Sequence, residues 1–185
     1  QKLVQLLIKD SMVLQKAPED LCISFITYIL KNSSKDPQLC PSYRPITCSD
    51  ILGKIIEETL GTIMNSQIPP THFEQFCGKP GYSSDLLNFS LISLLAERKR
   101  RGRPTFLLFL DIESAFDKSW LNGLWYTLHL RGLQSRLLTL LMSIYSNRKS
   151  SVKTQDALSE IFSILSGIAQ GSPNSTDLFC RYIDS

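Results

Sequence analysis

A short apolar run that ends at a carboxylate constrains the fold of this chain more than any other feature. Residues 106–110 read FLLFL, which has the length and composition of a buried β-strand, and Asp111 follows directly. The end of a strand holds a side chain rigidly, so the Asp111 carboxylate could bind a hard divalent cation there. Phe116 would place a flat apolar ring beside the same position. An ordinary alternative stays open, because acidic residues also favour the first turn of a helix that follows a strand.

A second motif lies near the C-terminal end of the sequence, where residues 166–179 read SGIAQGSPNSTDLF. The QGSP tetrapeptide at 170–173 is typical of a turn, and its glycine would let the backbone approach a ligand closely, since glycine has no Cβ atom. Leu178 and Phe179 then begin a predicted helix behind the turn. A QGSP tetrapeptide alone would more often be an ordinary loop, so its weight comes from its place after the first motif.

Three upstream segments complete a set of motifs in a fixed order. They read SYRPIT at residues 42–47, ILGKIIE at 51–57 and EQFCGKPGYSS at 74–84. With the two motifs above, this series resembles the reverse transcriptases of LINE-type (non-LTR) retrotransposons, from about Lys31 to the last residue. The sequence also departs from the family pattern. Lys79 and Tyr82 stand where two arginines are expected, and NST at 174–176 replaces LSP.

The resemblance implies an α+β fold, with the fingers and part of the palm of a right-hand polymerase. Residues 1–104 would form the fingers region with an N-terminal helix, and residues 105–185 a partial palm with an incomplete sheet. The family's third palm motif, an aromatic-x-Asp-Asp sequence, is absent, and Asp184 follows Pro173 too closely to supply that catalytic pair. Because the chain also begins with Gln rather than Met, we expect a fragment of an RNA-directed DNA polymerase.

The same resemblance implies roles for individual residues in a two-metal phosphoryl transfer that adds deoxynucleotides to a primer. Asp111 would be catalytic and would bind Mg²⁺, with help from the backbone carbonyl of Ile112. Lys31 and Arg44 would neutralise the triphosphate, although the motif around Lys31 is degraded. Since Asp111 is the one strong metal ligand, two divalent ions could not be held close together, and we expect the chain alone to be inactive.

The remaining nucleotide-binding residues implied by the resemblance are Phe116, Gln170 and Gly171. Phe116 would exclude a ribose 2′-hydroxyl, and the other two would line the nascent base pair and the template. The order of the two palm motifs predicts that Asp111 lies at a strand end and faces one cleft with Phe116, Gln170 and Gly171. Ordinary roles stay open here too, because Phe116 could be core and Gln170 could bond the loop backbone.

The charge distribution is more informative than the net charge of +3. Residues 91–150 contain ten Lys or Arg against four Asp or Glu, and RKRRGR at 98–103 is the densest run. This run could contact the phosphates of an RNA template and DNA primer, with salt-dependent affinity. A solvated surface and a nuclear-localisation signal stay open. The candidate nucleic-acid-binding residues are Lys79, Arg98, Lys99, Arg100, Arg101 and Arg103.

Length and composition indicate a folded globular protein, with 185 residues of which 43% are hydrophobic. The sequence lacks a run of 18 apolar residues and an N-terminal signal, so we expect neither a membrane span nor secretion. Its five cysteines are scattered without CxxC spacing, which argues against zinc and favours a nuclear or cytoplasmic location. The oligomeric state does not follow from the sequence.

Hydrophobic periodicity predicts most of the helices and strands. The expected helices lie before Pro18, from Ile51 to the Pro69-Pro70 pair with a cap at Ser49-Asp50, from Asp85 to Leu95, at 119–132 and at 133–145. The expected strands are 23–29 and 105–110, and a hairpin is expected from 151–154 and 160–165.

A competing interpretation is a non-catalytic nucleic-acid-binding or interaction module derived from the same fold. Resemblance of fold does not decide between these functions, because function depends on the site. The coding sequence downstream of Ser185 would separate them, since an aromatic-x-Asp-Asp motif there supports an enzyme.

Overall fold

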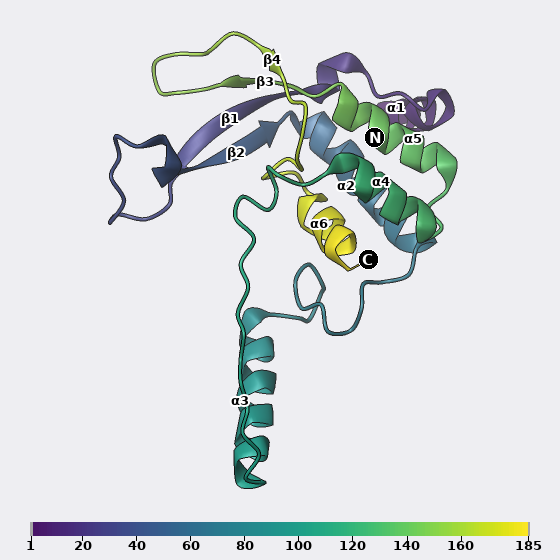
Figure 1. Cartoon of the computed structure of the whole chain (residues 1–185). Coiled ribbons are helices and arrows are strands. Elements are labelled where there is room, and N and C mark those ends of the chain that lie inside the picture. Colours follow the sequence, from purple (N-terminus) through teal and green to yellow (C-terminus); the bar gives the residue numbers. More distant parts are fainter. Residues whose placement is uncertain (1, 185) are drawn as a thin grey trace.

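The order of helices and strands follows the sequence-based prediction over most of the chain (Figure 1). The structure, a computed structural model, describes residues 2–184, and residues 1 and 185 lie outside the described part. The helices are α1 (Lys2–Leu14), α2 (Ile51–Gln67), α3 (Ser84–Arg100), α4 (Leu121–Leu130), α5 (Ser135–Ser146) and α6 (Ser175–Ile183), with short 3₁₀ helices η1 (Glu19–Cys22) and η2 (Cys40–Ser42). The strands are β1 (Ile23–Leu30), β2 (Tyr43–Ser49), β3 (Lys149–Val152) and β4 (Phe162–Ser163). The chain is therefore a mixed α/β protein.

A small mixed sheet is built around the long β1–β2 hairpin. The two strands pair antiparallel, from Ser24 opposite Ser49 to Leu30 opposite Tyr43. β3 adds parallel to β1, and β4 pairs antiparallel with β3, which gives the order β2-β1-β3-β4. β2 therefore forms one edge of the sheet, and its outer side can accept a loop.

The predicted hairpin after α5 is confirmed, although its first strand starts two residues earlier and its second strand is shorter than expected. Its ladder joins Lys149 to Ser163 and Ser150 to Phe162. The early start has a tertiary cause, because β3 pairs with β1 from its first residue. Strands from both sides of the predicted boundary at residue 104 thus share one sheet. The division into fingers and palm stays a prediction.

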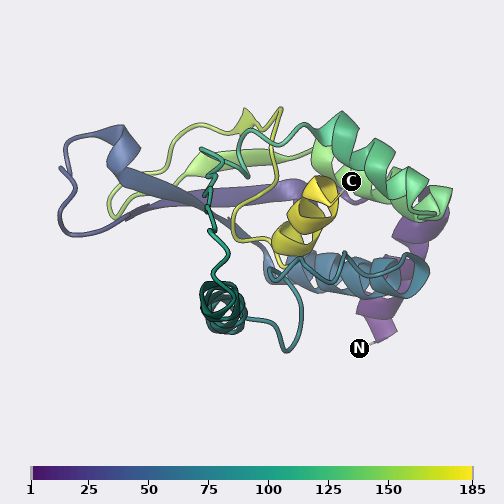
Figure 2. The ribbon, with the colours of Figure 1, turned by 60° about the horizontal axis from the view of Figure 1, so that its bottom comes forward.

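The hydrophobic core lies among the helices at one end of the sheet, away from the tip of the β1–β2 hairpin (Figure 2). The large side chains buried to at least 98% include Leu60 and Met64 of α2, Leu124 and Leu128 of α4, Leu137 and Leu140 of α5, and Leu178 of α6. Their spacing of three or four residues puts them on one face of each helix, which is why these segments fold as amphipathic helices. Each buried leucine contributes about 1.5–3 kcal/mol of burial free energy.

α2, which supports part of the site described below, begins and ends where the sequence predicts. The Asp50 carboxylate caps it by accepting a hydrogen bond from the Leu52 amide at 2.9 Å. The helix ends at Gln67, shortly before the Pro69-Pro70 pair, because proline has no amide hydrogen to continue the ladder.

α3 and the segment that follows it project from the rest of the molecule (Figure 1). Ser83 caps this helix by accepting from the Leu86 amide at 3.2 Å, so the helix begins one residue before the predicted start. The chain then turns at Gly102, with φ +63°, and returns alongside the helix, where Arg98 Nε donates to Thr105 Oγ1 at 2.8 Å. Every residue of α3 is exposed or half-buried. We call α3 together with residues 101–110 the stem.

The predicted strand at residues 105–110 is wrong for the part of the chain that the structure describes. These residues have no regular secondary structure, and the exposed fraction is 95% at Phe106, 83% at Leu108 and 79% at Phe109. A strand satisfies its backbone hydrogen bonds only beside a partner, and within residues 2–184 no strand of the sheet pairs with this segment. An apolar run of this kind indicates a surface suited to burial, but its partner decides whether it becomes a strand.

None of the helices formed by residues 2–184 is both long enough and apolar enough to cross a membrane. The Cys180 thiol on α6 donates to the Cys77 carbonyl at 3.5 Å, and burial raises the pKa of this thiol to about 12. Cys180 is therefore a protonated packing residue at neutral pH rather than a nucleophile.

Candidate functional site

One cavity collects all but one of the residues that the sequence indicates for metal and nucleotide binding, and Gly171 is the one that lies outside its lining. It has a volume of about 570 Å³ and lies between the loop end of the β1–β2 hairpin, the segment at 111–117 and the loop that carries Gln170. The predicted residues in its lining are Lys31, Arg44, Asp111, Ile112, Phe116 and Gln170. These residues come from four separate segments of the chain, so the fold brings them together.

The basic wall of the cavity is built by the β1–β2 hairpin. Arg44 stands opposite Ile29 in the ladder, and the Lys31 amide donates to the Ser42 carbonyl at 2.9 Å. Both basic residues are therefore anchored at the base of one loop, which the hydroxyl of Tyr43 helps to close through the Pro37 carbonyl. Two cations at one cavity favour an anionic ligand.

The acidic wall is the turn formed by residues 111–117. Ser114 has φ +55°, a left-handed conformation that is uncommon for residues other than glycine, and its carbonyl accepts from the Lys118 amide at 2.9 Å. Glu113 pairs with the Lys118 ammonium at 3.4 Å. Asp111 is exposed and does not lie at a strand end, contrary to expectation, because the segment before it forms no strand.

Phe116 links this turn to the rest of the site. Its ring packs against Phe179 of α6 with 5.1 Å between centroids, and its carbonyl accepts from the Ile168 amide at 2.8 Å. The ring is therefore fixed by α6, and the backbone by the segment that leads to Gln170.

Gln170 is held on the outer edge of β2. Its carbonyl accepts from the Thr47 amide at 2.7 Å. Gly171 follows with φ +112°, and a Cβ atom there would lie 2.6 Å from the Thr47 carbonyl oxygen, so only glycine fits. The close approach that Gly171 makes is to β2, and the approach to a ligand that the sequence suggests stays a prediction. α6 then begins at Ser175, earlier than the predicted start at Leu178.

Polar residues that support this loop were missed by the sequence analysis. Ser172 Oγ donates to the Glu57 carboxylate at 2.5 Å, and the Asn174 side-chain amide donates to the Glu57 carbonyl. Arg148 Nη2 donates to the Gly167 carbonyl at 2.7 Å. The loop is thus bonded to α2 at one end and to the segment after α5 at the other.

Burial sets the electrostatics of these supporting residues. It raises the pKa of the Glu57 carboxyl above its usual value, against the opposing effects of the Ser172 hydrogen bond and the Arg148 charge. It also lowers the pKa of the Arg148 guanidinium. Glu57 did have a sequence signal, because it shares a helical face with the buried Gly53 and Gly61, where a charge is unusual.

Oxygen ligands for a divalent cation are present at the cavity but sparse. The Asp111 carboxylate and Ile112 belong to the lining. Within residues 2–184, no cluster of three or more His, Cys, Asp or Glu is arranged to hold a metal ion. This donor set fits Mg²⁺, which keeps several water ligands and takes further oxygens from substrate phosphates.

Comparison with known proteins shows what the motifs and the cavity belong to. Residues 29–185 match the family model described as reverse transcriptase (RNA-dependent DNA polymerase). The chain belongs to the reverse transcriptase family. The matched range includes every residue that lines the cavity.

Two relatives support the predicted link of this reverse transcriptase chain to retrotransposons. It is 34% identical over 155 residues to the RNA-directed DNA polymerase from mobile element jockey of Drosophila funebris. It is 29% identical over 146 residues to the probable RNA-directed DNA polymerase from transposon X-element of Drosophila melanogaster. The alignments cover 80% and 76% of this chain but 16% of each relative. The chain thus spans a small part of the length of the relatives it matches.

The candidate nucleic-acid-binding residues of the reverse transcriptase chain lie apart from the cavity. The basic run occupies the C-terminal end of α3 and the turn after it, where Arg100 and Arg101 pair with Glu97 at 2.9 and 2.6 Å. Lys79 lies in the loop between α2 and α3, and its ammonium donates to the His72 carbonyl. The ion pairs reduce the positive charge that the run can offer to phosphates.

Asp184 is occupied by a structural ion pair. Its carboxylate accepts from Arg131 Nη2 at 2.6 Å and from the His72 amide at 2.9 Å. Burial would raise the pKa of this carboxyl, but the hydrogen bonds from Arg131 and His72 outweigh burial and hold the pKa below its usual value. The ion pair gives Asp184 a structural role, and the expectation that it is not a catalytic carboxylate stays a prediction.

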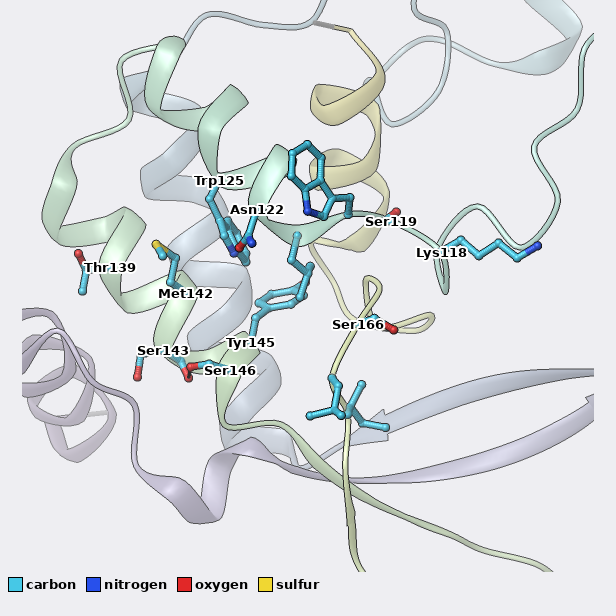
Figure 3. Close-up of a pocket in the computed structure, with 14 residues that line it drawn as sticks. Lys118, Ser119, Asn122, Trp125, Thr139, Met142, Ser143, Tyr145, Ser146 and Ser166 are labelled. Atoms are coloured by element: carbon cyan, nitrogen blue, oxygen red, sulfur yellow. Dashed lines mark hydrogen bonds between the residues drawn. The ribbon is translucent and has the colours of Figure 1, made fainter.

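A larger cavity lies between α4, α5 and residues 164–166 (Figure 3). Its volume is about 810 Å³, and its lining combines apolar side chains such as Trp120 and Met142 with several hydroxyls. Figure 3 shows Lys118, the charged residue of the described lining, extending away from the other labelled side chains. A metal-bound triphosphate needs more charge than this, so the smaller cavity is the better candidate.

Proposed function

We propose that this chain binds the incoming deoxynucleoside triphosphate in an RNA-directed DNA polymerase, as its fingers and the first part of its palm. One observation carries the proposal, namely the cavity of about 570 Å³ that brings Lys31, Arg44, Asp111, Phe116 and Gln170 together. Its volume lies in the range of about 300–1,000 Å³ typical of small-molecule sites. Membership of the reverse transcriptase family supports the reaction class.

The charges around the cavity suit a triphosphate bound with Mg²⁺. Lys31 and Arg44 would neutralise phosphate oxygens, and the planar guanidinium of Arg44 can bind two of them at once. The Asp111 carboxylate and the Ile112 carbonyl would hold the metal ion. When bound there, Mg²⁺ would neutralise charge that develops during in-line phosphoryl transfer to a primer hydroxyl.

The other side of the cavity suits a deoxyribose and a base pair. The Phe116 ring is fixed against Phe179 at 5.1 Å, so it cannot move aside easily for a 2′-hydroxyl. Gln170 is pinned to β2 through its carbonyl, which leaves its side chain to contact the nascent base pair. Gly171 would keep the loop flat against β2 and leave space for the template.

The RNA template and the DNA primer would be held in part by basic residues away from the cavity. Residues 99–103 of the run are exposed at the end of the stem, Arg98 is half-buried, and Lys79 lies in the loop between α2 and α3. Contacts from these residues to backbone phosphates would be independent of sequence and would weaken with salt.

Binding of a Mg²⁺–deoxynucleoside triphosphate to the 185-residue chain tests the proposed site. Arg44→Gln removes a charge and a forked donor, and Asp111→Asn keeps the shape of the side chain but removes the metal ligand. Each variant should weaken the affinity about tenfold, because a charged hydrogen bond contributes about 1.5–3 kcal/mol. Isothermal titration with dTTP and Mg²⁺ would measure the loss, and chelating the metal should abolish the effect of Asp111→Asn.

Arg136→Gln is the matched control, because Arg136 is exposed on α5 and lies outside the cavity. This variant removes the same charge and should leave the affinity unchanged. If Arg136→Gln and Arg44→Gln weakened binding equally, the triphosphate would be attracted by net charge alone. A wild-type chain that binds no triphosphate would refute the proposed site.

A further inference from the structure

The loop that carries Gln170 is fixed at both ends by side chains that lie outside the cavity lining. At its start, Arg148 donates to the Gly167 carbonyl at 2.7 Å. At its end, Ser172 donates to the Glu57 carboxylate at 2.5 Å. The role of Glu57 in this arrangement goes beyond packing.

Glu57 stands on a rigid support. It lies on α2 between Ile56 and Leu60, whose side chains are buried in the core. The loop packs directly on this helix, because a Cβ atom at Gly61 would collide with the side-chain oxygen of Asn174. A hydrogen bond from the loop to Glu57 therefore fixes the loop relative to the core.

A carboxylate that only filled space at this position would lower the stability of the fold compared with an apolar side chain. Burial of an acid that must lose its proton costs free energy, and burial raises the pKa of Glu57. Ser172 is also buried, so each of the two groups depends on the other for a partner. A hydrogen bond from a hydroxyl to a carboxylate is among the stronger hydrogen bonds in proteins.

This hydrogen bond acts on the cavity through the backbone that runs from Ser172 through Gly171 to Gln170. Gly171 separates Ser172 from Gln170 and lies against the Thr47 carbonyl, with no space for a side chain. Any displacement of Ser172 is therefore passed to Gln170, whose carbonyl accepts from the Thr47 amide at 2.7 Å. The Thr47 amide reports directly on whether Gln170 is in place.

We propose that Glu57 is a positioning residue, which holds Gln170 in the nucleotide cavity by fixing Ser172. The inference rests on the proposed function for its consequence in nucleotide binding. Its structural part, the placement of Gln170 on β2, is measured independently of any ligand.

Hydrogen exchange at the Thr47 amide tests the structural part in the 185-residue chain. Glu57→Ala and Ser172→Ala should each raise the Thr47 exchange rate on the order of tenfold, as expected for the loss of one charged hydrogen bond. The amide of Leu128 in the core of α4 should keep its rate. Glu57→Gln keeps an acceptor oxygen and should restore most of the protection at Thr47.

The exposed neighbour Glu58 provides the matched control. Glu58→Ala removes the same side chain one position along α2 and should leave the Thr47 exchange rate unchanged. In the double variant Glu57→Ala with Ser172→Ala, the rise at Thr47 should be no greater than in either single variant, because both break the same bond.

The affinity for dTTP with Mg²⁺ tests the functional part in the same proteins. We expect Glu57→Ala and Ser172→Ala to weaken it several-fold, Glu57→Gln to recover it, and Glu58→Ala to leave it unchanged. An unchanged Thr47 rate in Glu57→Ala, or an equal rise at Leu128, would refute positioning. Faster Thr47 exchange with unaltered affinity would show that Gln170 does not serve the nucleotide. If the wild type binds no dTTP, the proposed function fails, while the Thr47 rates still decide whether Glu57 places Gln170.

Discussion

Two carboxylates of this chain, Glu57 and Asp184, show how surroundings decide the contribution of the same chemical group. Asp184 receives hydrogen bonds from Arg131 and from the His72 amide, which outweigh burial and lower its pKa. At Glu57, burial outweighs the hydrogen bond from Ser172 and raises the pKa. Ionisation therefore stabilises the fold at Asp184 and costs stability at Glu57.

The raised pKa of Glu57 predicts a dependence of stability on pH. The folded-state pKa lies above the usual value of 4.5, so the favourable contribution is present at low pH and is lost as the pH rises through the folded pKa. Glu57→Gln cannot ionise, so its free energy of unfolding should rise relative to the wild type between about pH 4 and pH 8. Urea unfolding of both proteins across this range measures the difference, and parallel stability curves would contradict the prediction.

The candidate site could be predicted from the sequence only where its residues belong to motifs. Arg44, Asp111 and Gln170 each sit in a motif whose order along the chain was visible, and the structure brings them to one cavity. Arg148 belongs to no such motif. It acts through a contact with Gly167 that exists only after α5 and the loop have packed.

Among the elements, helices were predicted better than strands because a helix closes its hydrogen bonds within its own segment. The cap at Asp50 and the apolar spacing of α2 sufficed to place that helix. A strand depends on a partner that can lie anywhere in the chain. The parallel pairing of β3 with β1 was therefore not predicted, and residues 105–110 were assigned to a strand that does not form in the described chain.

The stem predicts self-association of the 185-residue chain. Its exposed apolar residues include Phe106, Leu108, Phe109 and Leu110, and contact between two stems would remove them from water. Leu108→Ser should weaken this association about tenfold, because burying one leucine contributes about 1.5–3 kcal/mol. Sedimentation velocity over a range of protein concentrations would show the change.

Leu165→Ser is the control for this experiment, because Leu165 is exposed to 88% and Leu108 to 83%, yet Leu165 lies outside the stem. It should leave the association constant unchanged. A wild-type chain that remains monomeric at all concentrations would contradict self-association through the stem.

At the scale of the whole molecule, two of the cavities formed by residues 2–184 differ in character. The cavity between the β1–β2 hairpin, residues 111–117 and Gln170 carries charges of both signs. The cavity between α4, α5 and residues 164–166 is larger, at about 810 Å³, but its walls are mainly apolar and hydroxyl-bearing. Of these two, the second cavity is larger, whereas the charge required by a triphosphate favours the first.

Photo-crosslinking with an azido-substituted deoxynucleoside triphosphate tests this choice most directly. With Mg²⁺ present, peptide mass spectrometry should find the label at residues 41–45, 111–117 or 170, and unmodified dTTP should compete it away. Asp111→Asn should reduce the labelling, because the metal-bound triphosphate would lose its carboxylate ligand. Label that is concentrated at Trp120 or Met142 in the larger cavity, or that persists under excess dTTP, would contradict the account.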